Sequence, residues 1–84
     1  MKNKNSYWNC RIMAHHHSNS EDAYFAIHEI YYEKDIPVSY TENAVAVVFE
    51  ELSDISDYLD KMKLALSKPV LWAGEKFPNE YIAK

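Results

Sequence analysis

Two alternating, aromatic-rich segments joined by a short polar stretch constrain the fold of this chain more than any other feature. Residues 7–16, YWNCRIMAHH, alternate between apolar and polar side chains, as a half-buried strand does. The apolar face of this segment consists of Trp8, Cys10, Ile12 and Ala14. Residues 23–33, AYFAIHEIYYE, are apolar on both faces and rich in β-branched and aromatic residues, which is typical of a central strand. The stretch between them, SNSED, favours a turn, so the sequence predicts a β-hairpin.

A third strand and one helix follow the predicted hairpin. The segment KDIP indicates a second turn, and residues 38–49, VSYTENAVAVVF, indicate a third strand with an interruption at Asn43. An apolar stripe whose members step by three and four residues predicts the helix; it consists of Leu52, Ile55, Leu59, Met62 and Leu66. We expect Ser53 to cap the first turn of this helix and Pro69 to end it at about Lys68.

These elements predict an α+β fold with one domain over residues 7–71. Residues 1–6 are expected to form a flexible N-terminus, and residues 72–84 a C-terminal tail or arm. Short connections favour a three-stranded antiparallel meander, and the amphipathic helix would cover one face of it, in the order βββα. The tail is aromatic, and the sequence leaves open whether it packs on its own domain or on a second chain.

Charge and composition disfavour several classes of function. The 84 residues carry 13 acidic and 9 basic side chains, and Arg11 is the only arginine. Neutralising phosphates needs clustered Lys and Arg, so nucleic-acid binding is not expected. A bilayer requires about 20 consecutive apolar residues, and no such run is present, so membrane insertion is not expected. The single cysteine, Cys10, forms no internal disulfide, which predicts a cytoplasmic protein.

The pairing of the strands decides where His28 lies. If paired residue numbers in the first hairpin sum to 40, Arg11 lies opposite Glu29 in a favourable cross-strand charge pair. His28 then lies on the apolar face, opposite Ile12. If the numbers in the second hairpin sum to about 70, Glu42 lies opposite His28 and would orient its ring for general acid–base chemistry.

Two interpretations of His28 follow. The residue is either a half-buried histidine with satisfied hydrogen bonds or, with Glu42, the weak candidate for the catalytic centre of an enzyme or for a small-molecule site. The chain has no P-loop, no dinucleotide-binding glycine pattern, no GxSxG and no CxxC motif, and no convincing nucleophile accompanies the pair. We therefore assign no catalytic residue and no cofactor, and we do not expect an enzyme.

The histidine triplet at residues 15–17 also has two interpretations. His15 and His17 share one side of the predicted strand, with Glu21 or Asp22 near them in the turn, so they are weak candidates for a metal-binding hairpin. Zinc requires three or four well-held ligands, which two histidines and mobile acids do not supply. The triplet is therefore interpreted as the polar end of the hairpin, with no metal assigned.

One helix covers only one face of the predicted sheet. The opposite face would display five large apolar side chains: Tyr7, Met13, Phe25, Ile27 and Tyr31. A soluble monomer rarely exposes so large an apolar patch, so we expect a homodimer or a protein partner to cover it. The sequence thus predicts a non-catalytic protein-interaction or regulatory module that self-associates.

The segments YWNCRI, AIHEIYY and MKLALSKPVLW resemble a family of short bacterial proteins with a W-N-x-R opening and an H-E-x-Y-Y second strand. That resemblance covers most of the chain and implies no activity. In element order the chain is also similar, more distantly, to the N-terminal domain of HicB-type antitoxins, with Tyr24 and the segment EELSDISDYLDKMKLAL in comparable places. Phe49 and Glu50 stand where that pattern has a glycine, and the chain after Leu71 is too short for the DNA-binding domain of many such antitoxins.

Overall fold

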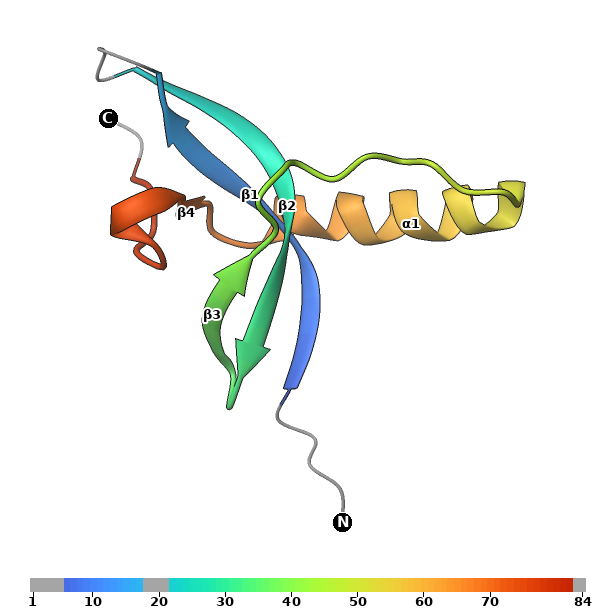
Figure 1. Cartoon of the computed structure of the whole chain (residues 1–84), viewed down its shortest axis with the longest axis horizontal. Coiled ribbons are helices and arrows are strands. Elements are labelled where there is room, and N and C mark those ends of the chain that lie inside the picture. The colour runs from blue at the N-terminus through green and yellow to red at the C-terminus, as the bar shows by residue number, and fades with distance from the viewer. Residues whose placement is uncertain (1–5, 18–21, 83–84) are drawn as a thin grey trace.

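The computed structural model, which describes residues 6–17 and 22–82, is a curled four-stranded sheet with one helix (Figure 1). The strands are β1 (Ser6–His16), β2 (Ala23–Glu33), β3 (Ile36–Tyr40) and β4 (Leu71–Trp72). The helix α1 spans Leu52–Leu64, and two short 3₁₀ turns span Ala65–Ser67 and Gly74–Lys76. No helix in the described parts of the chain is long and apolar enough to cross a membrane.

The sheet has the strand order β3-β2-β1-β4, and its β1–β4 pair is parallel whereas the other pairs are antiparallel. The prediction of a three-stranded antiparallel meander is therefore wrong. The fourth strand has only two residues, too few to give a periodic signal. Contacts with β1 hold it in place: Met13 pairs with Leu71, and the N–H of Ala73 donates to the carbonyl of Ala14 at 2.9 Å.

The first hairpin pairs residues whose numbers sum to 39, so the predicted register is wrong by one residue. Cys10 lies opposite Glu29, and Arg11 lies opposite His28. The prediction assumed that one face of the hairpin is apolar and the other is open to water. Both faces are in fact covered, so each face buries a mixture of apolar and polar side chains.

The helix covers one face of the hairpin. The core on this side is formed by Cys10 of β1, Tyr58 of α1 and Ala65, and partly buried side chains pack around them: Ile12, Ile27, Val45, Val47 and Met62. The hydroxyl of Tyr58 donates to Oε2 of Glu29 at 2.8 Å and lies 3.7 Å from Sγ of Cys10. This network ties the middle of α1 to both long strands.

The C-terminal segment covers the other face of the hairpin. A second core here consists of Met13, Ile30, Tyr32 and Leu71, with Tyr40, Ala73 and Phe77 packed against it. Arg11 connects the layers, because Nη1 donates to the hydroxyl of Tyr32 and Nη2 to the carbonyl of Pro69, both at 2.7 Å. The aromatic tail therefore packs on its own chain.

The third strand is shorter than predicted. β3 follows a two-residue turn in which Lys34 and Asp35 have positive φ angles, as in a type I′ turn, and it ends at Tyr40. Residues 41–51 then leave the sheet and run beside α1 (Figure 1). Two backbone bonds tie this segment to β2: the N–H of Thr41 donates to the carbonyl of Glu29 at 3.0 Å, and the N–H of Val45 donates to the carbonyl of Ile27 at 2.9 Å.

The helix begins and faces differently from the prediction. Glu51, and not Ser53, is its N-cap residue, although the extended conformation of Lys68 agrees with an end before Pro69. Tyr58 is the buried residue of α1, whereas three members of the predicted apolar stripe are exposed: Leu52 by 84%, Leu59 by 50% and Leu66 by 72%. Turning Tyr58 inward satisfies the Glu29 carboxylate and leaves the leucines at the edge of the contact.

The two tyrosines that bind Glu29 give a direct test of this packing. We expect Tyr58→Phe to lower the free energy of unfolding by about 1 to 2 kcal/mol, because it removes a buried donor to the carboxylate and the partner of the Cys10 thiol. Tyr31→Phe removes the other donor to Glu29, at 2.8 Å, but at an exposed position, and should cost less than about 0.5 kcal/mol. Urea unfolding measures both, and equal losses would contradict the role given to Tyr58.

Candidate functional site

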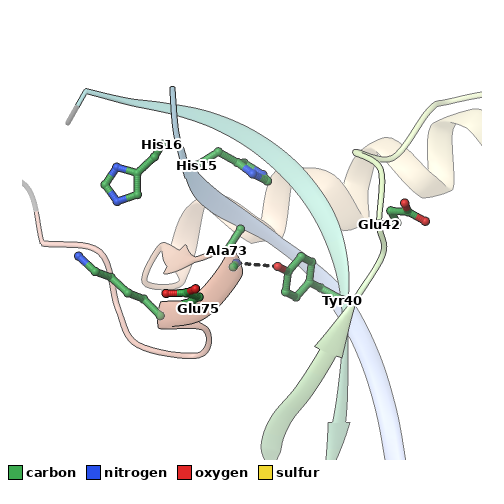
Figure 2. Close-up of a pocket in the computed structure, with 8 residues that line it drawn as sticks. His15, His16, Tyr40, Glu42, Ala73 and Glu75 are labelled. Carbon is green, nitrogen blue, oxygen red and sulfur yellow. Dashed lines mark hydrogen bonds between the residues drawn. The ribbon is translucent and has the colours of Figure 1, made fainter. Parts of the chain in front are cut away.

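An open groove of about 580 Å³ lies between the end of β1, the end of β3 and the 3₁₀ turn Gly74–Lys76 (Figure 2). Its lining is His15, His16, Tyr40, Glu42, Ala73, Gly74, Glu75 and Lys76. The hydroxyl of Tyr40 accepts the N–H of Gly74 at 2.7 Å across the groove. The walls are aromatic as well as polar, because the ring of His16 stacks on Trp72 with centroids 4.5 Å apart.

His28 lies behind this groove, 2% exposed, and both of its ring nitrogens have partners. Nδ1 is 2.9 Å from the carbonyl oxygen of Thr41, and Nε2 is 2.9 Å from Nε2 of His15. A carbonyl oxygen only accepts, so Nδ1 of His28 carries a proton and donates to Thr41, while the two Nε2 atoms share a second hydrogen bond. The two imidazoles thus form a chain of hydrogen bonds from β1 through β2 to the end of β3.

This chain of hydrogen bonds has a structural role and leaves no ring nitrogen of His28 for catalysis. A catalytic histidine needs a nitrogen within reach of a substrate, and both nitrogens of His28 are occupied. The thiol of Cys10 lies on the helix side of the sheet, and burial raises its pKa. Neither group is presented to the groove as a nucleophile or a base.

The predicted pair of His28 and Glu42 does not form. The second hairpin does pair with a sum of 70 at Tyr40, as predicted, but β3 ends there and the carbonyl of Thr41 takes the position expected for the carboxylate. Glu42 lines the groove with its carboxylate turned away from Tyr40 (Figure 2).

The predicted metal hairpin is also not assembled. His15 and His17 both pack on Tyr24, with centroids 5.0 and 4.9 Å from its ring, and Nε2 of His15 is engaged with His28. Over residues 6–17 and 22–82, no three ligating side chains are grouped to hold a metal ion. Glu21 lies outside the described residues.

The five predicted interaction residues do not share one face. Met13 is fully buried against the C-terminal segment, and Tyr7, on the same side, stacks on Tyr32 with centroids 4.6 Å apart. Phe25, Ile27 and Tyr31 lie on the opposite face, since β-strand residues alternate between faces; Ile27 packs in the core beside α1, and Phe25 contacts Tyr81 of the C-terminal segment. The single open face that was expected is therefore wrong, while a role of Phe25 or Tyr31 in binding stays a prediction.

Beside its contact with the sheet, α1 and the 3₁₀ turn after it carry exposed leucines that the sequence analysis assigned to the core. We call Leu52, Leu59 and Leu66 the leucine ridge. Leu52 and Leu59 are seven residues apart on α1 and so align with a drift of about 20°, and Leu66 follows in the 3₁₀ turn Ala65–Ser67. Ile55 and Met62 lie between them on the sheet side and are partly buried. The spacing does not distinguish the two rows, because Ile55 and Met62 are also seven residues apart.

Charge is divided along the same helix. Residues 50–60 carry five acids and no base: Glu50, Glu51, Asp54, Asp57 and Asp60. Residues 61–68 carry three bases and no acid: Lys61, Lys63 and Lys68. The halves agree with the helix dipole, which favours acids near the N-terminus and bases near the C-terminus.

The histidine pair predicts a pH dependence of stability. Burial, followed by the charge of His28, lowers the pKa of His15 below its ordinary value of 6.5. The unfolded chain then binds more protons at this residue as the pH falls below about 6.5, so the contribution of neutral His15 to stability decreases with acidification. His15→Gln keeps an N–H donor but does not titrate, and we expect it to lose less stability between about pH 7 and about pH 5 than the parent protein does.

Thermal or urea unfolding over this pH range measures the difference. His17→Gln is the matched control, because His17 is exposed just past β1. If His17→Gln reduces the pH dependence of stability as much as His15→Gln does, or if His15→Gln does not reduce it, the assignment to the histidine pair is contradicted.

Comparison with known proteins returned no match: no family model, no curated protein and no solved structure is similar to this chain. The resemblances to a short bacterial family and to HicB-type antitoxins therefore stay predictions, and the functional argument depends on the geometry alone.

Proposed function

We propose that this protein is a non-catalytic interaction module that self-associates in the cytoplasm as a homodimer, using the leucine ridge of α1. The observation that carries the proposal is the exposure of three leucines, two aligned on α1 and the third in the 3₁₀ turn that follows it. Single exposed leucines are ordinary on protein surfaces, whereas aligned apolar rows are typical of binding surfaces.

The energetic scale supports a dimer of modest affinity. Full burial of one leucine is worth about 1.5 to 3 kcal/mol, and the ridge leucines of two copies, about two-thirds exposed, would together gain about 6 to 12 kcal/mol. Association costs about 4 to 15 kcal/mol in lost freedom. Because the two amounts are similar, we expect the populations of monomer and dimer to change with protein concentration.

The groove supports a non-catalytic role. His28, behind the groove, is bonded on both ring nitrogens, the Tyr40 hydroxyl in the groove binds a backbone N–H, and the thiol of Cys10 lies on the other side of the sheet. In the groove, the one observation that favours a second function, small-molecule binding, is its volume, and its mixed lining of acids, a lysine and histidines indicates no ligand class. We therefore place the function on the helix.

Substitution on two sides of α1 tests the proposal. Leu59→Glu should shift the dimerisation constant to weaker binding by at least about 100-fold, because each copy loses an apolar contact and places a charge in the interface. Leu64→Glu is the matched control: Leu64 is 64% exposed and lies about 140° around the helix from Leu59.

Light scattering over a concentration series measures both variants, and circular dichroism verifies that each retains its helix. A wild-type monomer at all concentrations, or equal effects of the two substitutions, would refute self-association through the ridge.

A further inference from the structure

A second pocket, of about 140 Å³, lies where the C-terminal end of α1 meets β1. Its lining comes from two parts of the chain: Trp8, Asn9 and Cys10 of β1, and Lys61, Leu64 and Lys68 at the end of α1 and just after it. We propose that this pocket binds a small carboxylate, whose aromatic or branched apolar part fills the pocket and whose charge lies beside the two lysines. This inference is independent of self-association, which it neither requires nor excludes.

The size and the apolar lining of the pocket fit one ring or one short branched chain. Trp8 is 42% exposed, so part of its indole surface is open to a ligand. Cys10 is 2% exposed and therefore lies at the inner end of the pocket, whereas the exposed side chain of Leu64 lies at its rim. A cavity of about 150 Å³ with an apolar lining holds benzene, so a space of this size accepts a phenyl ring.

The charged groups of the lining are both lysines, which selects an anion. Lys61 extends over Trp8, with Nζ 5.4 Å from the ring centroid, and within residues 6–17 and 22–82 neither Lys61 nor Lys68 forms an ion pair with a carboxylate. Glu29 pairs with Cys10 across the hairpin, but its two oxygens already accept tyrosine hydroxyls. A few polar groups beside an apolar pocket typically fix the orientation of a ligand, and a carboxylate is the group that two ammonium donors bind best.

The dipole of α1 also favours lysines at this end of the helix, whether or not a ligand binds. Lys61 and Lys63 both lie in the last turn, but only Lys61 lines the pocket. Lys63 is thus the matched control, because it shares the effect of the dipole and lacks the contact with the pocket.

Titration with a ring that carries one carboxylate tests the proposal. Phenylacetate is the probe, and phenylacetamide is its neutral counterpart. Each is added to isotope-labelled protein, and the indole N–H resonances of the two tryptophans are followed by NMR. Trp8 lines the pocket, whereas Trp72 stacks on His16 at the other end of β1 and is the internal reference. We expect a saturable shift at Trp8 with phenylacetate and a much smaller shift at Trp72.

Three variants show whether the lysines bind the carboxylate, and circular dichroism verifies that each retains its helix. Lys61→Gln and Lys68→Gln should each raise the dissociation constant of phenylacetate about 3- to 10-fold, because each removes a charge-assisted contact, whereas Lys63→Gln should change it less than about 2-fold. Phenylacetamide should bind more weakly than phenylacetate by a similar factor.

A short peptide that ends in phenylalanine with a free carboxylate distinguishes the source of the ligand. Tighter binding than that of phenylacetate identifies the terminus of a chain, and binding that is no tighter identifies a free acid. No saturable shift at Trp8 up to about 20 mM phenylacetate, a ceiling above the affinity expected for so small a ligand, would overturn the proposal. Equal binding of phenylacetamide, or an equal loss in Lys63→Gln, would overturn it as well.

Discussion

The pairing of β1 with β2 in the register that sets Cys10 against Glu29 determines how the rest of the chain packs. Because residues alternate between faces, this register sends Glu29 to one side of the hairpin and His28 with Arg11 to the other. Each side then contains polar groups that water cannot reach freely. The covering segments supply part of the partners: Tyr58 of α1 donates to Glu29, and the carbonyl of Pro69 accepts from Arg11. The partners of His28 are His15 and Thr41.

On each side of the hairpin, a polar group specifies the position of a covering element. Glu29 accepts the hydroxyl of Tyr58 and so fixes the rotation of α1. On the opposite side, Arg11 donates to the carbonyl of Pro69 and brings the chain back for β4. A buried polar group left without a partner costs about 1 to 3 kcal/mol, so rotated or displaced versions of either layer are disfavoured. Apolar contacts alone would not discriminate among such positions as strongly.

Much of the local structure was predictable from the sequence, whereas the tertiary arrangement was not. The two long strands and the helix follow from periodicity within one segment, and their predicted ranges overlap β1, β2 and α1 closely. The register, the parallel β4 and the partner of His28 depend on residues far apart in the chain. The predicted register, in which paired residue numbers sum to 40, was favoured because it sets Arg11 opposite Glu29. In the structure these two side chains bind tyrosines on opposite faces of the hairpin. Charge attraction between exposed groups is weak, so the burial of side chains on both faces of the hairpin decides the register.

The apolar stripe of α1 shows why a correct periodicity led to an incorrect core. Five residues at alternating steps of three and four cover an arc of the helix wider than the contact with a curled sheet. Once Tyr58 is drawn inward by Glu29, the arc is divided: Ile55 and Met62 turn to the sheet, and the leucine ridge turns outward. The same pattern that forms the helix therefore divides into an inner row that packs on the sheet and exposed leucines that the core does not use. The rotation of α1 that Tyr58 fixes decides which residues belong to each set.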